Sequence, residues 1–107
     1  MSAYLQVVTT TALREEADRI ARELVETRLA ACVQIVGPIA STYRWQGKIE
    51  TSAEWQCWAK TRDDLFDRVS EAIRRIHPYE VPEILALPVV AGSASYLAWL
   101  DAETTRS

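Results

Sequence analysis

The sequence contains little of what most small catalytic and binding sites are built from. In 107 residues there are one histidine, two cysteines and three glycines. Cys32 and Cys57 are too few and too far apart for a disulfide scaffold or a CxxC site. The chain has no Walker A loop, no GxGxxG motif and no GxSxG motif. We therefore expect a protein with reduced thiols, located in the cytoplasm, and without the common nucleotide-binding or hydrolase signatures.

Three further absences narrow the class of partner. No apolar run approaches the ~20 residues that a membrane helix needs. The first residues have neither the basic region nor the apolar region of a signal peptide. The formal net charge is -3, whereas a nucleic-acid-binding domain normally carries a basic face. Neither a membrane nor a nucleic acid is expected as a partner.

The remaining composition is that of an ordinary globular protein. Hydrophobic residues make up 49% of the chain and charged residues 25%. A chain of this length can bury one compact core. No low-complexity segment or linker interrupts it. We therefore predict a single domain that spans residues 1–107.

The spacing of apolar residues predicts the order of the secondary-structure elements. β-rich runs predict strands near residues 5–9, 31–36 and 84–90, and alternation with period two extends the second strand to residue 45 and predicts another strand at residues 48–61. The second of these strands is broken or bent at Gly37-Pro38. Helical spacing predicts one amphipathic helix from Leu13 to Val25 and another from Leu65 to Ile76. Gly92-Ser93 begins a short C-terminal helix.

This β-α-β-β-α-β order, followed by one helix, is that of a ferredoxin-like sandwich in the α+β class. In this fold the first and third strands are central and the other two are edges. Pro88 agrees with an edge position for the last strand. Right-handed crossovers place both long helices on one face of the sheet. The turn Gln46-Gly47 joins the middle strands into a long hairpin of roughly ten residues or more per arm.

The hairpin predicts self-association. Its arms carry Tyr43, Trp45, Trp55 and Trp58, which is too much aromatic surface for arms that overhang a small core. Long aromatic edges left bare would promote aggregation. We expect the arms to pair with other subunits in a closed ring of identical chains.

The segment His77–Ile84 is the best candidate for a ligand site. Pro78 ends the preceding helix and forces an extended path. With about three residues per turn, such a link places His77, Glu80 and Glu83 on one side, where they could bind a metal ion. In the alternative reading, His77 is a structural residue at a helix C-terminus. The two carboxylates would then pair with arginines such as Arg44, Arg74 and Arg75.

Other residues have both a functional and a structural reading. Cys32 is a soft metal-ligand candidate, but its place in an apolar strand favours a buried core residue. Glu54, Trp58 and Lys60 share one strand face, so the two charges belong either to an ion pair at a subunit boundary or to a pocket. Tyr79 is expected at an interface. We assign the following residues to an inter-subunit cleft or interface: Tyr43, Trp45, Glu54, Trp58, Lys60 and Tyr79.

No enzymatic activity is expected. Nucleophilic catalysis needs a base beside the nucleophile. A single histidine would have to serve Cys32 or a serine with no visible orienting partner. The acidic pairs Glu15-Glu16 and Asp63-Asp64 lie at predicted helix starts, where capping explains them.

Several blocks of the sequence resemble the CutA family of divalent-cation tolerance proteins. The blocks are Leu29–Val33, Ser41–Glu50, Glu54 with Lys60-Thr61, His77–Ile84 and Tyr96–Trp99. The resemblance implies a ferredoxin-like fold, a homotrimer similar in plan to the PII signalling proteins, and a link to copper and other divalent cations. Some copper-linked relatives carry a second histidine and a cysteine where this chain has Ile76 and Thr10.

Three hypotheses follow for the function. The first is a trimer that acts in divalent-cation tolerance and binds copper or another divalent cation weakly. The bound cation is not required for folding. The second is a PII-like sensor that binds a small anion or metabolite in the cleft between subunits. The third is a scaffold for a partner protein.

Overall fold

The structure, a computed structural model, describes residues 3–106 and follows the predicted order of elements. A short 3-10 turn at Asp63–Leu65 leads directly into the second helix. The elements are β1 (Tyr4–Thr11), α1 (Arg14–Glu26), β2 (Cys32–Trp45), β3 (Lys48–Arg62), α2 (Phe66–Ile76), β4 (Leu85–Pro88) and α3 (Ala94–Glu103).

The four strands form one antiparallel sheet with the order β2-β3-β1-β4. The predicted ferredoxin-like arrangement is confirmed, because β1 and β3 are central while β2 and β4 are edges. The strand β4 is shorter than predicted and ends at Pro88, which pairs with Leu5. Proline has no N–H to donate, so an edge is the place in a sheet where it fits.

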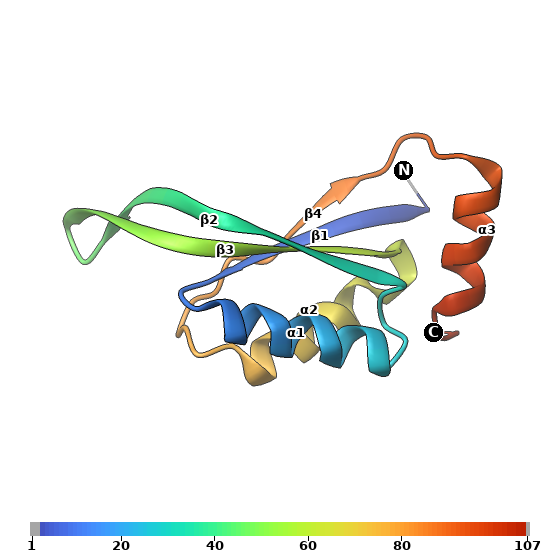
Figure 1. The fold of residues 1–107 in the computed structure, drawn as a ribbon, viewed down its shortest axis with the longest axis horizontal. Helices are drawn as coiled ribbons and strands as arrows, with labels where there is room; N and C mark the ends of the chain where they lie inside the picture. Colours follow the sequence, from blue (N-terminus) through green and yellow to red (C-terminus); the bar gives the residue numbers. More distant parts are fainter. Residues whose placement is uncertain (1–2, 107) are drawn as a thin grey trace.

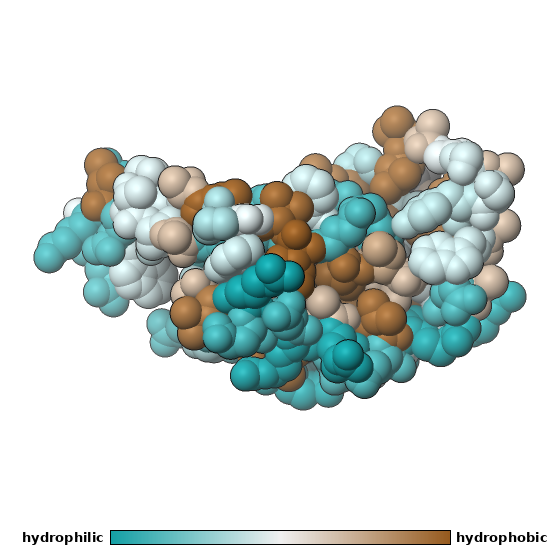
Figure 2. Space-filling view, viewed as in Figure 1, coloured by the Kyte–Doolittle hydropathy of each residue, from teal (hydrophilic) through white to brown (hydrophobic). Residues whose placement is uncertain are grey.

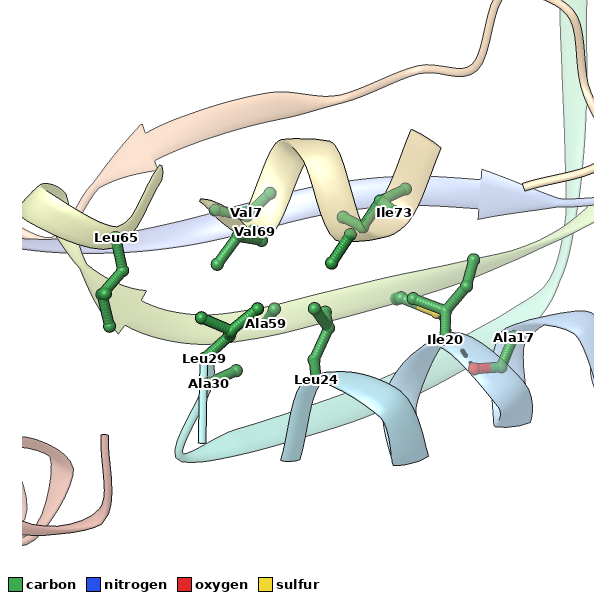
Figure 3. Packing of buried hydrophobic residues seen from close by; sticks show 12 residues of the cluster. Val7, Ala17, Ile20, Leu24, Leu29, Ala30, Ala59, Leu65, Val69 and Ile73 are labelled. Carbon is green, nitrogen blue, oxygen red and sulfur yellow. Dashed lines mark hydrogen bonds between the residues drawn. The ribbon is translucent and has the colours of Figure 1, made fainter. Parts of the chain in front are cut away.

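Both long helices cover one face of the sheet, as Figure 1 shows. The core lies between the two layers (Figure 3) and contains Val7 of β1, Ala59 of β3 and Ile20 of α1, each 1% exposed. The helix α1 buries a narrower stripe than predicted. Leu13 and Val25, placed on that stripe by their spacing, are 51% and 43% exposed. Leu13 precedes the first helical residue, and Val25 lies about 100° around the helix from the buried Leu24, on the side of Asp18 and Arg22.

The strand β2 bends at Gly37-Pro38 and then continues. The register with β3 shifts between Val36 and Ile39. A Cβ atom at Gly37 would lie 2.7 Å from Cε3 of Trp55, so the indole ring occupies the space that any side chain would need. The bend is therefore built from a glycine on β2 and a tryptophan on β3.

Beyond this bend the hairpin extends past the helix layer (Figure 1). Its turn has positive φ angles at Gln46 (52°) and Gly47 (80°), the signature of a type I′ turn. Tyr43 Oη and Ser52 Oγ lie 3.2 Å apart across the two arms. Trp45 and Ile49 are 43% and 68% exposed. Within one chain, the hairpin end is ordered by its own ladder and turn without a second layer beneath it.

Candidate functional site

His77 fastens the link after α2 to the end of β1. Its backbone leaves the helical region (φ -76°, ψ 132°), as expected before Pro78. Its Nε2 lies 2.7 Å from the carbonyl oxygen of Thr10, and its Nδ1 lies 3.1 Å from the backbone nitrogen of Tyr79. Since Tyr79 N–H can only donate, Nδ1 accepts and Nε2–H donates to Thr10.

Both ring nitrogens of His77 are therefore engaged, and the residue is only 8% exposed. An imidazole binds a metal through an unprotonated nitrogen with a free lone pair. Metal ligation by His77 would require the ring to leave at least one of these hydrogen bonds. The ligand role stays a prediction, and this geometry favours the structural role.

Tyr79 connects the link to a buried carboxylate on β3. Its ring packs against that of His77, with centroids 4.7 Å apart. Its hydroxyl donates to Glu54 Oε2 at 2.7 Å. Burial, followed by the hydrogen bond and the charge of Glu54, raises the pKa of Tyr79, so the phenol remains a donor. Glu54 is 8% exposed, which is unusual for a carboxylate and which the sequence did not indicate.

Glu83 lies near this pair. Burial, followed by the negative charge of Glu54, raises its pKa. The link thus brings two carboxylates and a phenol together beyond the end of β1. Neither Glu80 nor Glu83 forms an ion pair with any residue in the range 3–106, so the alternative pairing with arginines does not occur within this part of the chain.

Lys60 lies on the face of the sheet opposite α1 and α2. Its Nζ donates to Gln34 Oε1 at 2.8 Å and lies 5.8 Å from the centroid of the Trp58 ring. Burial lowers its pKa, against a smaller opposing effect of Cys32. Glu54 is six residues away, or about 20 Å along an extended strand. The two charges share a strand face as predicted, but they do not pair with each other within one chain.

The prediction that Cys32 is a core residue is wrong. Cys32 is partly exposed and opposes Lys60 in the ladder, on the face of the sheet opposite α1 and α2. The alternation of β2 instead directs Val33 towards the core. The buried thiol is that of Cys57, which is 1% exposed and lies 3.5 Å from the Ala17 carbonyl oxygen. Burial, then the charge of Asp18, raises the Cys57 pKa to about 11, so this thiol stays protonated.

The predicted metal ligands do not form a complete site in one chain. Across residues 3–106, no three His, Cys, Asp or Glu side chains are grouped so that they could hold a metal ion. Cys32 is on a different part of the sheet from the link. A groove of about 380 Å³ between α1 and α2 contains none of the predicted site residues. A cation bound here would need donors from a second chain or from water.

The aromatic residues predicted at an interface do not form one cluster among residues 3–106. Tyr43 and Trp45 are 42% and 43% exposed on the extended hairpin. Trp58 is partly buried on the face of the sheet opposite α1 and α2, beside Lys60. Sequence reasoning missed the carbonyl of Thr10 and the amide of Gln34, which hold His77 and Lys60. Main-chain acceptors carry no residue-type signal, whereas the register of β2 and β3 would have indicated Gln34.

Comparison with known proteins identifies the relatives of this chain. Residues 5–103 match the family described as CutA1 divalent ion tolerance protein. The divalent-cation tolerance protein CutA of Thermus thermophilus is 46% identical over 92% of this chain and 97% of its own length. The chloroplastic protein CutA 1 of rice is 43% identical over 88% of this chain, which spans only 53% of that longer relative.

Solved structures agree with these sequence matches. The CutA1 crystal structure from Oryza sativa superposes with a TM-score of 0.95 at 40% identity, covering 99% of this chain and 97% of the other. The structure of the divalent cation tolerance protein from Thermus thermophilus gives a TM-score of 0.92 at 43% identity, with 95% and 99% coverage. No helix within residues 3–106 is long and apolar enough to cross a bilayer. The chain belongs to the CutA1 divalent ion tolerance family.

Proposed function

We propose that this protein contributes to divalent-cation tolerance as a homotrimer that binds copper or another divalent cation weakly and without catalysis. The observation that carries the cation site is the proximity of Glu54 and Glu83. Glu54 is buried, and its charge helps to raise the pKa of Glu83. A divalent cation between the two carboxylates would relieve this repulsion. Its further donors would come from a second chain or from water, because no three His, Cys, Asp or Glu side chains in residues 3–106 are grouped to hold a metal ion.

The donor set explains why binding is weak. Carboxylate oxygens suit hard cations, whereas copper prefers several imidazole or sulfur ligands. The imidazole of His77 is committed to Thr10 and Tyr79. In this proposal His77 positions the link, and becomes a ligand only if a cation displaces one of its hydrogen bonds. The same commitment leaves no histidine nitrogen free to act as a general base, which supports a non-enzymatic role.

The trimer is supported by the parts of the sheet that one chain leaves incomplete. Within residues 3–106, the edge strands β2 and β4 have no neighbouring strand on their outer sides. Leu85 and Leu87 on β4 are 57% and 47% exposed, and the hairpin exposes further apolar residues. Unpaired edges with apolar side chains are the surfaces on which strands from other subunits add. The expected native mass is that of three chains.

Calorimetric titration of the purified protein with Cu(II) and Zn(II) tests the cation site. Replacement of a carboxylate that binds the cation should lower affinity several-fold, so Glu83→Gln should bind Cu(II) more weakly than wild type. Glu71→Gln is the matched control, since Glu71 is an exposed acid on α2 that contacts Arg74 instead. If Glu83→Gln and wild type bind with equal affinity, the cation site is not at the link.

A small anion or metabolite bound between subunits is the second candidate, and Lys60 favours it. This partly buried ammonium group has a neutral hydrogen-bond partner, Gln34, and no ion pair with any residue in the range 3–106. A carboxylate or phosphate would complete its surroundings. Titration with ATP and with common metabolites discriminates the two candidates. Lys60→Met, which keeps the apolar stem, should abolish anion binding and leave Cu(II) binding unchanged.

We further place the protein in the cytoplasm. Cys32 and Cys57 are both free thiols, one on the sheet surface and one in the core. Free thiols persist in a reducing compartment. Cell fractionation followed by immunodetection tests this assignment, and recovery of the protein outside the cytoplasmic fraction would overturn it.

A further inference from the structure

The helix α3 packs on the rest of the chain less closely than the other two helices. Three residues of α1 and three of α2 belong to the core cluster, whereas none of the residues of α3 does. Leu100 is the only residue of α3 that is buried. Figure 1 shows α3 at the end of the sheet, outside the layer formed by α1 and α2. An element with so few buried apolar contacts can open at a smaller free-energy cost than the core.

The segment between β4 and α3 can act as a hinge. Val89 still donates its N–H to β1. Residues 90–93 belong to neither β4 nor α3, and Val90 is 89% exposed. The side chain of Ser93 accepts a hydrogen bond from the backbone N–H of Tyr96 and caps the helix. The first turn of α3 is therefore completed within its own segment and does not depend on the sheet.

Two arginines from other elements hold the C-terminal end of α3. Arg28, just after α1, donates from Nη2 to the carbonyl oxygen of Ala102 at 2.8 Å. The carbonyl oxygen of Arg28 accepts the N–H of Thr105, also at 2.8 Å. Arg62, at the end of β3, donates from Nη1 to Thr104 Oγ1 at 2.7 Å. These hydrogen bonds fix the end of the helix while little apolar surface is buried. We call Arg28 and Arg62 the latch.

Arg28 occupies a position where glycine is usual. The N–H of Arg28 donates to the Val25 carbonyl oxygen and that of Leu29 to the Leu24 carbonyl oxygen, so α1 ends in a Schellman motif. Arg28 has the left-handed conformation of this motif, with φ of 60°. Glycine adopts this conformation without steric cost, whereas a residue with a Cβ atom does not. The backbone alone therefore favours glycine here, and the contacts of the Arg28 side chain with the end of α3 explain the arginine.

The N-terminal half of α3 covers the thiol of Cys32. Burial, followed by the charge of Cys32 and a hydrogen bond with its thiol, raises the pKa of Tyr96, which places the phenol beside the sulfur. Lys60 opposes Cys32 in the ladder of β2 and β3. In Figure 2, pale residues near the middle of the hydropathy scale gather over α3, whereas hydrophilic residues dominate the outside of α1 and α2. Movement of α3 would therefore uncover Cys32 and the part of the sheet next to Lys60.

We propose that α3 is a lid over Cys32, hinged at residues 90–93 and held closed by the latch. In the closed state Tyr96 covers the thiol. When the hydrogen bonds of the latch break, α3 moves away and solutes reach Cys32 and the adjoining Lys60. The core stays folded during this movement, because α3 contributes no residue to the core cluster. If an anion binds at Lys60, the lid also regulates the second candidate function, and that part alone rests on the function proposed above.

Labelling of the native protein with N-ethylmaleimide, followed by peptide mass spectrometry, tests the lid. Cys32 reacts when α3 opens, whereas Cys57, 1% exposed in the core, reacts only when the whole chain unfolds. Arg28→Gly removes a latch side chain and suits the backbone at this position. The labelling rate of Cys32 should therefore rise about threefold or more, while that of Cys57 does not rise. Arg22→Ala is the matched control, since Arg22 is an exposed arginine of α1 that contacts Glu26 instead. Equal Cys32 rates in wild type and Arg28→Gly would overturn the lid, as would a parallel rise at Cys57, which would mean that the whole fold is loosened.

Hydrogen exchange measured by mass spectrometry provides a second test. Relative to their intrinsic rates, amides of α3 should exchange faster than those of α2, and Arg28→Gly should accelerate exchange in α3 alone. Tyr96→Ala removes the cover and not the latch, so it should raise the Cys32 labelling rate without faster exchange at residues 100–103. A common exchange rate for α3 and α2, or an unchanged Cys32 rate in Tyr96→Ala, would contradict the lid. Neither measurement uses an anion, so a titration in which ATP does not bind would remove the second candidate function and leave the lid in place.

Discussion

The two ends of the strand β3 have different surroundings within the same continuous ladder. Between Glu54 and Thr61 the strand lies over the helices, and Cys57 and Ala59 are each 1% exposed. Between Lys48 and Ala53 it pairs only with β2, and Ile49 is 68% exposed. The first half is hydrogen-bonded to β1 on one side and to β2 on the other, whereas the second half is hydrogen-bonded to β2 alone. The difference teaches that one chain supplies the core beneath the first half, whereas no layer of residues 3–106 covers the second half.

Large-to-small substitutions should give the largest contrast between the two halves. Leu24→Ala removes a side chain that is 1% exposed in the core and should destabilise the fold by about 2–5 kcal/mol. Ile49→Ala on the hairpin should change the unfolding free energy of the isolated chain by less than about 0.5 kcal/mol. Urea denaturation at several protein concentrations measures both.

The dependence of unfolding on protein concentration separates effects on folding from effects on assembly for Leu24→Ala and Ile49→Ala. If Ile49→Ala lowers the free energy of unfolding only at concentrations where the protein associates, Ile49 contributes to a subunit interface. Equal losses for Leu24→Ala and Ile49→Ala at low concentration would show that the hairpin end is already packed within one chain.

The boundary between the two halves should be the next most sensitive position. Gly37→Ala places a Cβ atom 2.7 Å from the Trp55 ring, so the bend must move, at a cost of about 1–3 kcal/mol. The cost should shrink in a Trp55→Leu background, where the ring that blocks the Cβ atom is gone. A double-mutant cycle in thermal or urea unfolding measures this coupling. If the effects of Gly37→Ala and Trp55→Leu on the free energy of unfolding are additive, the cost of Gly37→Ala comes from the backbone at Gly37 and not from the Trp55 ring.

The same contrast explains what the sequence could predict. The apolar run of β1 and the helical spacing of α1 and α2 reflect burial within the chain, and they helped to predict the order of the elements. The ferredoxin-like plan then predicted the sheet edges. Cys32 was misassigned because both of its neighbours, Ala31 and Val33, are apolar, so composition hid the alternation. The burial of Glu54 depends on Tyr79 arriving from a distant loop. Such contacts between segments leave no local pattern in the sequence.

Replacing two buried threonines, Thr9 of β1 and Thr61 of β3, by valine should change the free energy of unfolding differently. The Thr9 hydroxyl has no hydrogen-bond partner among the described residues, whereas that of Thr61 donates to the Leu29 carbonyl oxygen at 2.6 Å. Thr9→Val should therefore be neutral or stabilising by up to about 1 kcal/mol, because a buried unsatisfied polar group is removed. Thr61→Val should destabilise by about 1–2 kcal/mol. Urea unfolding decides between the two signs, and a clear loss for Thr9→Val would reveal a partner for its hydroxyl.

The smallest effect is expected at the link, where stability should depend on pH. Burial and the charge of Glu54 raise the pKa of Glu83 above its ordinary value of 4.5. The folded state then binds a proton more tightly than the unfolded state, so this contribution to stability is present below pH 4.5 and is lost as pH rises through the folded pKa. Glu83→Gln removes the titration. Its melting temperature relative to wild type should therefore increase as pH rises through this window, in scans at fixed protein concentration with a chelator. Glu80→Gln removes an equal charge from the same link. A difference of the same size for Glu80→Gln would mean that net charge, rather than the position of Glu83 beside Glu54, is the cause.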